Sequence, residues 1–475
     1  TFSQLLWCGP VGRLENSIFF ASATHNSPLL LRAGDTMLRI CGERIFIQWE
    51  RSKVLRSLPV AILVIIAALD RADMALLGAS FPMLEKTLGV HVDTLGYFSL
   101  FQNLSYALSI PFWAWLVHRY RVQNAHIILS MSCFLWGIAT LSIAQSETIV
   151  SQAFFRCLNG GALASILPLS QMMLVDLVPT SMRGSAFGLM GLLERVAAMI
   201  ATSAVVWYDD WRIPYSVVGS ISILMAFSAK QYLQMTTKIE DEKPKGEELS
   251  MLGIVKRVSR EPSFVYLIAQ GVFGAIPWNM MSFIVLLLKW KDFTKKEIIS
   301  FQVSAGIIGS LGVFLGGVSG DYFGHLPRGR VGVALFSIMS ESLFYSLFLY
   351  SDTYHSCIFW KSLFHLFGGW ATAAAIRPLC ADLAQNQSER AQISAAWVFL
   401  DKTSSAVFGA PLVGYMTKQL FDDNLILTNR EKARLLSRSM SFLSTFFWGV
   451  SAYFWMRIGK AEINRKRMNT RCDSP

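Results

Sequence analysis

The chain has 475 residues and a net charge of +11, and 53% of its residues are hydrophobic while only 16% are charged. Soluble domains carry about 25% charged residues, so this composition excludes a soluble enzyme and an intrinsically disordered chain. The excess of Lys and Arg fits the cytoplasmic loops of a membrane protein, and no soluble domain is left over to bind nucleic acid. The 7 cysteines stand singly, which indicates neither a zinc site nor a disulfide framework.

Apolar runs of about 20 residues are long enough to cross a bilayer. They predict twelve membrane-spanning helices, at residues 57–79, 95–117, 124–145, 148–177, 184–207, 212–229, 262–288, 298–324, 331–350, 355–381, 390–416 and 439–457. The long polar connection after the sixth helix divides them into two groups. We therefore expect an all-α polytopic membrane protein with two six-helix bundles. The predicted parts are a cytoplasmic extension (1–56), the first bundle (57–229), a cytoplasmic central loop (230–261), the second bundle (262–457) and a cytoplasmic tail (458–475).

The orientation follows from the loops, because Lys and Arg concentrate on the cytoplasmic side of membrane proteins. The bias is strongest when both termini are placed in the cytoplasm. Two basic segments, KWKDFTKK at 289–296 and NREKARLLSR at 429–438, then face outward and break the rule. The sequence offers no reason for this exception.

Charged residues inside predicted helices mark candidate functional positions, because each costs about 2.5–3.5 kcal/mol at the bilayer centre on insertion scales. The first helix carries Asp70, Arg71 and Asp73, and the fourth carries Arg156 and Asn159. From the predicted helix ends, Asp70 and Arg156 lie at similar depth, so a pair between them is geometrically possible. The pair is interpreted either as a protonation or substrate switch, or as a static ion pair that fixes helix packing.

Further candidates lie in helices five, seven and eleven. They are Glu194 next to Arg195, Asp401 next to Lys402, and the polar or aromatic residues Gln270, Trp278 and Asn279 around Pro277. Each has an alternative structural role in helix packing. The histidines are not spaced for a shared metal, and no phosphate loop or nucleophile motif occurs. The sequence therefore predicts no catalytic residue, no metal, no cofactor and no enzyme activity.

The turn after the eighth helix reads G-G-x-x-G-D, ending at Asp321, with Arg330 nine residues on. This topology and motif resemble the major facilitator superfamily, whose members repeat an Asp-Arg-containing turn after the second and eighth helices. The first copy here has His118 at the acidic position, followed by Arg119. The resemblance implies that these turns latch the cytoplasmic gate, and that the first latch is altered.

Within that superfamily the chain looks most like the spinster-like branch, in its plant and protist form. The matching segments are LDRADMALLGASFP at 69–82, R-x-x-N-G-G at 156–161, RGSAFGLMG at 183–191, GAIPWNMMSF at 274–283 and SERAQISAAWVFLDK at 388–402. The resemblance implies a proton-linked or facilitative carrier of lysophospholipids or sphingoid lipids, with Asp70, Arg71 and Arg156 as its polar coupling cluster. A glutamate common in the branch after the helix-four arginine is replaced by Leu163.

We accordingly predict a secondary active or facilitative transporter that moves a small amphipathic or organic solute by alternating access. The predicted pathway residues are Asp70, Arg71, Asp73, Arg156, Asn159, Glu194, Gln270, Trp278, Asn279 and Asp401, and the gating residues are His118, Arg119, Asp321 and Arg330. Its partners are the bilayer, the solute and, in the coupled case, protons. We expect a monomer in the plasma membrane or an endolysosomal-type membrane. Two alternatives stay open: a uniporter or antiporter of sugars or drug-like solutes, and a non-transporting receptor or scaffold.

Overall fold

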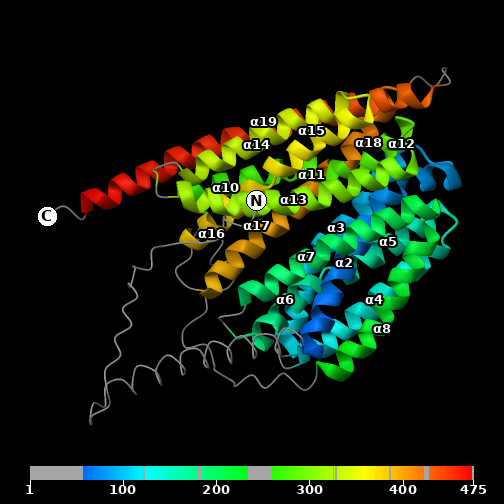
Figure 1. The fold of residues 1–475 in the computed structure, drawn as a ribbon. Coiled ribbons are helices and arrows are strands. Elements are labelled where there is room, and N and C mark those ends of the chain that lie inside the picture. The colour runs from blue at the N-terminus through cyan, green and yellow to red at the C-terminus, as the bar shows by residue number, and fades with distance from the viewer. Residues whose placement is uncertain are drawn as a thin grey trace, which may run out of the picture. The chain divides into compact units, whose positions relative to one another are not determined.

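The computed structural model describes residues 57–120, 124–179, 183–233, 259–324, 326, 329–383, 387–421 and 427–472, and these residues form helices joined by short turns (Figure 1). The predicted extension at 1–56 lies outside the described residues, and so does most of the central loop. The first group of helices is α2 (Leu58–Leu88), α3 (Val92–Tyr120), α4 (Ala125–Gln145), α5 (Ile149–Leu163), α6 (Ile166–Leu177), α7 (Arg183–Tyr208) and α8 (Arg212–Tyr232).

The second group begins with the interrupted seventh span. Its elements are α10 (Pro262–Gly274), α11 (Ile276–Met280), η4 (Met281–Phe283), α12 (Ile284–Trp290), α13 (Lys295–Phe323), α14 (Gly329–Tyr350), α15 (Tyr354–Phe367), η5 (Thr372–Ile376), α16 (Arg377–Leu383), α17 (Gln387–Phe408), α18 (Ala410–Gln419) and α19 (Asn429–Cys472). All twelve predicted spans correspond to these elements, so the predicted fold class is confirmed. Among the described residues, seven helical segments are long and apolar enough to cross a membrane by length and composition alone.

Several spans are broken where the sequence contains helix-interrupting residues. The seventh is interrupted at Ala275, just before Pro277, whose ring cannot donate a backbone hydrogen bond. The tenth stops at Gly368 and turns through Gly369, which has a φ of +80° that glycine adopts freely. The eleventh is interrupted at Gly409, before Pro411.

Two helices are longer than predicted. α2 continues from residue 79 to Leu88 and ends at Gly89, which has a φ of +60°. α19 begins at Asn429, where the Thr428 hydroxyl and the Glu431 carboxylate hydrogen-bond each other's backbone N–H groups, and it runs to Cys472. The capping pair starts this helix ten residues earlier than its apolar run suggests, because capping satisfies the first backbone donors whatever the hydropathy.

Helices within each group approach closely at glycines. In α5, a Cβ on Gly160 would lie only 2.0 Å from the backbone oxygen of Gln102 in α3. In α13, a Cβ on Gly312, Gly316 or Gly320 would lie within 3 Å of α15, Trp370 or the π-helical turn η5. Such contacts fix the backbones that carry the polar side chains described below.

Candidate functional site

A buried polar network inside the first bundle surrounds Asp73 of α2. Asp73 Oδ2 accepts hydrogen bonds from Trp136 Nε1 at 3.0 Å and Thr140 Oγ1 at 2.8 Å, both on α4. Asp73 Oδ1 accepts a bond of 3.1 Å from Asn159 Nδ2 on α5. Asp73 and Asn159 have no exposed surface. The network joins three helices and satisfies a carboxyl group that would be costly to bury alone.

Arg156 of α5 extends the same network rather than lining an open passage. Its Nη1 donates to Gln102 Oε1 at 3.3 Å and to the Tyr215 hydroxyl at 3.1 Å, and its guanidinium lies over the rings of Tyr215 and Phe98. Gln102 Nε2 in turn donates to Asn159 Oδ1 at 2.9 Å. Arg156 is completely buried, and all of these contacts lie within its own bundle.

The predicted contact between Asp70 and Arg156 is not formed, since none of the hydrogen bonds or ion pairs among the described residues joins them. The prediction misjudged depth because it ended the first helix at residue 79. With α2 ending at Leu88, Asp70 lies 18 residues from that end, about 27 Å at 1.5 Å per residue. Arg156 lies only seven residues from the start of α5 at Ile149. Asp73, one turn nearer to Leu88, is the acid that reaches α5.

Asp70 instead belongs to a set of charges that faces the second bundle. It is 6% exposed, and its Oδ1 has no hydrogen-bond partner among the described residues. Arg71 is half exposed, with its Nε 4.0 Å from Glu194 Oε2 of α7. Lys402 of α17 lies within electrostatic range of both Asp70 and Arg71, and half-buried Asp401 precedes it in the chain. Acidic and basic groups from both bundles therefore meet here.

The interrupted seventh span also carries polar and aromatic groups. Asn279 Oδ1 accepts the Ala410 backbone N–H at 2.9 Å, so it caps the start of α18, and it also lies 3.5 Å from the Ser99 hydroxyl of the first bundle. The Trp278 side chain is 39% exposed and packs beside Phe364, with ring centroids 5.4 Å apart. Gln270 is buried and its Nε2 has no partner among the described residues.

Ion pairs join the bundles at one end, which we call the closed end and define by the turns at residues 89–91, 209–211 and 291–294 and by residues 420–421 and 427–428. Every carboxylate comes from the first bundle and every ammonium from the second. The pairs are Asp209 with Lys289 (2.8 Å) and Lys295 (3.7 Å), Asp93 with Lys418 (2.9 Å), and Glu85 with Lys432 (3.8 Å). Three of these lysines belong to the two basic segments that break the charge rule, so the closed end supplies their reason.

The ion pairs at the closed end change the pKa of Asp209. It occupies the turn between α7 and α8 with a φ of +53°, a left-handed conformation that Asp tolerates better than most residues. The hydrogen bond from Lys289, together with the charges of both lysines, holds the pKa of the Asp209 carboxyl below its ordinary value. Its ionised form is therefore favoured while the closed end is formed.

Backbone contacts seal the closed end beneath the ion pairs. A Cβ on Gly78 of α2 would lie 2.7 Å from the Ser282 backbone oxygen. A Cβ on Gly96 of α3 would lie 2.7 Å from the Ala410 oxygen, and one on Gly414 of α18 would lie 2.7 Å from the Val92 oxygen. These positions have no room for a side chain, so the bundles touch backbone to backbone here.

The predicted gating residues lie at the opposite ends of the helices. Arg119 is exposed near the end of α3, while the side chain of His118 lies outside the described residues. Asp321 is exposed in the last turn of α13, and Arg330 is half-buried at the start of α14. The Arg330 Nε is 3.1 Å from the place of a Cβ on Gly324, so the second turn is tight. The described residues include no cross-bundle ion pair at this end.

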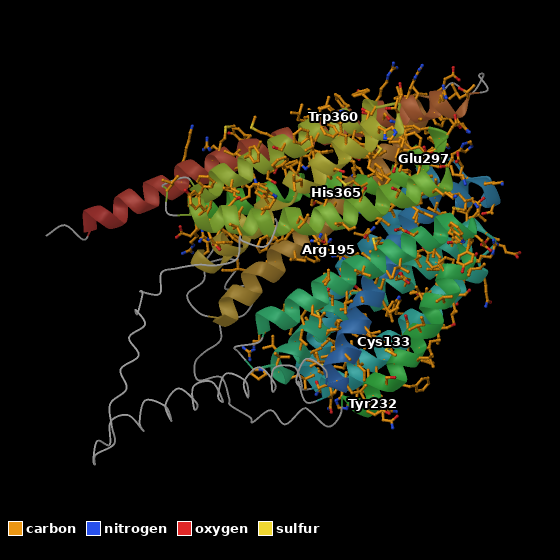
Figure 2. All side chains as sticks on the ribbon, viewed as in Figure 1. Cys133, Arg195, Tyr232, Glu297, Trp360 and His365 are labelled. Atoms are coloured by element: carbon orange, nitrogen blue, oxygen red, sulfur yellow. The ribbon has the colours of Figure 1, made fainter. Side chains whose placement is uncertain are left out.

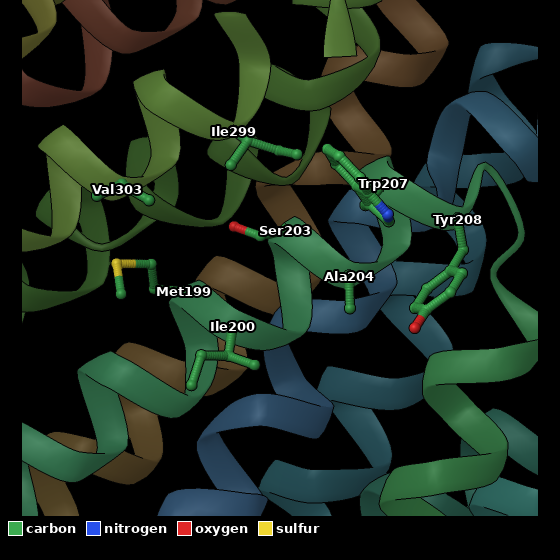
Figure 3. Close-up of a pocket in the computed structure, with 8 residues that line it drawn as sticks. All are labelled: Met199, Ile200, Ser203, Ala204, Trp207, Tyr208, Ile299 and Val303. Atoms are coloured by element: carbon green, nitrogen blue, oxygen red, sulfur yellow. The ribbon is translucent and has the colours of Figure 1, made fainter. Parts of the chain in front are cut away.

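A pocket of about 430 Å³ lies between α7 and α13 (Figure 3). Its lining includes Met199, Ile200, Ser203 and Trp207 of α7 and Ile299 and Val303 of α13. No charged side chain is among its lining residues, so the lining differs from the charged residues around Asp70.

Comparison with known proteins identifies the family. The model of the Major Facilitator Superfamily matches residues 63–410. The chain therefore belongs to the Major Facilitator Superfamily and is an integral multi-pass membrane protein. The D-galactonate transporter of Escherichia coli O6:H1 is 25% identical over 178 residues, which are 37% of this chain and 40% of that protein. An uncharacterized MFS-type transporter of Bacillus subtilis is 25% identical over 187 residues, or 37% of this chain and 39% of that protein.

Solved structures share the fold at low sequence identity. A bacterial homologue of the human lysosomal transporter Spinster, in an inward-facing and unoccupied conformation, has a TM-score of 0.70 at 16% identity, covering 87% of this chain and 98% of that one. A nucleoside transporter mutant gives 0.67 at 12% identity, covering 84% and 99%. A D-xylose-proton symporter gives 0.58 at 12%, covering 82% and 96%. At these identities the likeness shows the fold alone, which this chain shares with the Spinster homologue and with the other two transporters.

Sequence reasoning missed the uncharged partners of the buried network. Gln102, Thr140, Trp136 and Tyr215 lie on helices without a central charge, and a search for charge alone passes over them. An amide, indole or hydroxyl in the middle of an apolar helix was the available signal, since each such group needs a partner in the membrane. The closed-end pairs were signalled by the basic segments that broke the charge rule.

Proposed function

We propose that this chain is a secondary transporter that moves a small organic or amphipathic solute by alternating access between its two bundles. The observation that carries the proposal is the asymmetry of the cross-bundle contacts. Ion pairs and backbone contacts join the bundles at the closed end, whereas the predicted gating turns at the other end have no such pairs among the described residues. In the predicted orientation the closed end is the outer one, so this state admits a solute from the cytoplasm.

The polar region around Asp70 is the proposed passage. Asp70, Arg71 and Glu194 from the first bundle and Trp278, Asn279 and Asp401 from the second would contact the solute or a proton. Asp70 is the proposed proton acceptor, because it is buried and one of its oxygens has no partner among the described residues. Asp73, Asn159 and Arg156 would be positioning residues, since their hydrogen-bond network holds α2, the helix that carries Asp70.

The proposed solute class rests on similarity and on the side chains of the proposed passage. Proteins with this fold or partial sequence similarity are named for D-galactonate, nucleosides, D-xylose with a proton, and the Spinster transporter. We propose an amphipathic or anionic solute, a lysolipid or sphingoid lipid included, because the passage combines charges with aromatic Trp278. Sugars and drug-like solutes are the second candidate class.

The proposal is tested first by measuring distances between the two bundles at both ends of the molecule, and then by measuring uptake of solutes. Spin labels at exposed Glu147 and His355 would report the closed end, and labels at exposed Tyr232 and Lys460 the opposite end. Alternating access predicts two populations in which one distance lengthens as the other shortens. A single population at both ends, whatever the solute or pH gradient, would refute the proposal and favour a receptor or scaffold.

Uptake into proteoliposomes then tests coupling. We expect a solute from the panel of sugar acids, nucleosides, pentoses and single-chain lipids to accumulate when a pH gradient is imposed. Asp70→Asn should abolish the response to the gradient while leaving exchange without a gradient. An unchanged gradient response in Asp70→Asn would exclude Asp70 as the proton acceptor.

A further inference from the structure

Two basic side chains from different bundles meet beside one glycine. Arg195 projects from α7 of the first bundle, and His365 from α15 of the second. A Cβ on Gly309 of α13 would lie 3.6 Å from Arg195 Nη1 and 3.6 Å from His365 Nδ1. The two nitrogens are therefore at most twice that distance, about 7 Å, apart. Figure 2 shows both labelled residues in the region where α7 faces α13 and α15.

No hydrogen bond or ion pair to Arg195 or His365 occurs among the described residues. The carboxylate of Glu194 lies within electrostatic range of Arg195, but its ion-pair contact is with Arg71, at 4.0 Å. Basic groups inside the spans of membrane proteins often mark the path of a substrate or ion.

A further basic side chain, Lys361, lies near His365. Lys361 lies one turn from His365 on the same face of α15, and both Lys361 and Arg195 are within electrostatic range of His365. Lys361 is 3% exposed and its ammonium lies 4.4 Å from the ring centroid of Phe364, with the rings of Tyr345 and Phe348 also around it. Its polar contact among the described residues is the Met281 sulfur at 3.8 Å, not a carboxylate.

Gly309 differs from Gly312, Gly316 and Gly320 of the same helix. Gly312, Gly316 and Gly320 are needed for packing, because a Cβ at each would lie within 3 Å of neighbouring atoms. A Cβ at Gly309 would meet only ordinary contacts, and those contacts are the two basic side chains. Glycine is thus not required there by helix packing, and its absent side chain leaves space between Arg195 and His365.

We propose that Arg195 and His365 form a binding site for the acidic group of the transported solute, a carboxylate or a phosphate, at Gly309. This inference rests on the proposed transport function and names its substrate class. Two oxygens of one acid group, each about 2.9 Å from a nitrogen, span the separation of the two side chains. Because the site has one half on each bundle, an acid bound there stabilises the arrangements in which α7 and α13 are close.

The test measures binding to the purified full chain in nanodiscs, without requiring transport. The acidic probes are hexyl phosphate and D-gluconate, each with a neutral match, 1-hexanol and D-glucitol. We expect one acidic probe to bind and to raise the melting temperature, and its neutral match to do neither. Hexyl phosphate binding alone indicates a lipid-like phosphate, whereas gluconate binding alone indicates a water-soluble carboxylate.

Variants locate the site. Gly309→Ala fills the space without changing charge and should weaken binding of the acidic probe at least tenfold, and Arg195→Gln should do the same, while Arg195→Lys retains part of the affinity. Gly306→Ala is the matched control, one turn away on α13, where a Cβ would meet only the Met199 sulfur at 3.8 Å. It should bind as the unmodified protein does.

Three results would overturn the proposal: neither acidic probe binds, a neutral match binds equally well, or Gly309→Ala and Arg195→Gln bind as tightly as Gly306→Ala. The outcome is separate from that of the transport test. A chain that changes conformation at both ends but ignores both acids retains the transport function and loses this site. A chain that binds an acid at Gly309 but never opens its closed end retains the site and loses transport.

Discussion

Replacing Gly96 with alanine should open the closed end. The new Cβ would lie 2.7 Å from the Ala410 oxygen and 3.0 Å from the Pro411 Cα, which are backbone atoms of α18 that cannot rotate away. Overpacking a tight contact costs about 1–3 kcal/mol. Because about 1.4 kcal/mol is a tenfold change in an equilibrium constant, the ratio of closed to open molecules should fall roughly 5- to 150-fold. Alanine also favours the helix within α3, so the first bundle itself should remain folded.

The assay is the distance between spin labels at Glu147 and His355 in a background without other reactive cysteines. Gly96→Ala should increase the long-distance population at the closed end. Gly449→Ala is the control, because a Cβ there would meet no atom within 4 Å, and it should leave the distribution unchanged. If Gly96→Ala remains folded and keeps the distances of the unmodified chain, the backbone contact at Gly96 does not hold the closed end.

Two further predictions concern charge and buried hydrogen bonds. The hydrogen bond with Lys289 lowers the pKa of Asp209, so this pair stabilises the closed end at pH values above the ordinary pKa of 3.8. The stabilisation is lost as the pH falls through the lower pKa that Asp209 has in the closed end. Both side chains are well exposed, so the effect on the free energy of closing is about 0.2–1 kcal/mol. Label distances measured between pH 7 and pH 3 should show a larger acid response in the unmodified chain than in Asp209→Asn, and equal responses would contradict the pair's role. Trp136→Phe removes one hydrogen-bond donor to Asp73 and should lower the free energy of unfolding by about 1–3 kcal/mol. Its melting temperature should be lower than that of the control Trp115→Phe, because Trp115 is 56% exposed. Equal melting temperatures would show that the hydrogen bond contributes nothing.

The sequence predicted helices well because hydrophobic length sets a membrane span. It predicted helix ends poorly where local chemistry overrides hydropathy. α2 passes the predicted end at residue 79 and stops only at Gly89, where a left-handed conformation is available. The error moved Asp70 in depth and led to a pairing with Arg156 that the structure does not contain.

The sequence marks the candidate polar residues as unusual intramembrane groups, but their division into two sets was not predictable. Asp70 and Asp73 share a helix face three residues apart, yet Asp73 is enclosed by Trp136, Thr140 and Asn159 while one Asp70 oxygen has no partner among the described residues. Which acid is enclosed depends on the tilt and register of neighbouring helices, and spacing along one helix carries no information about either.

The sequence by itself determined the membrane class, the number of spans and the positions that carry buried charge, because each follows from local composition and the cost of burying polar groups in lipid. The family followed from the resemblance of its motifs. Tertiary structure alone decided which charges meet. Asp209 finds Lys289, 80 residues away, and Asp93 finds Lys418, 325 residues away. These partners come from different bundles, so their encounter depends on how two independently packed groups of helices close against each other, and no local pattern encodes that.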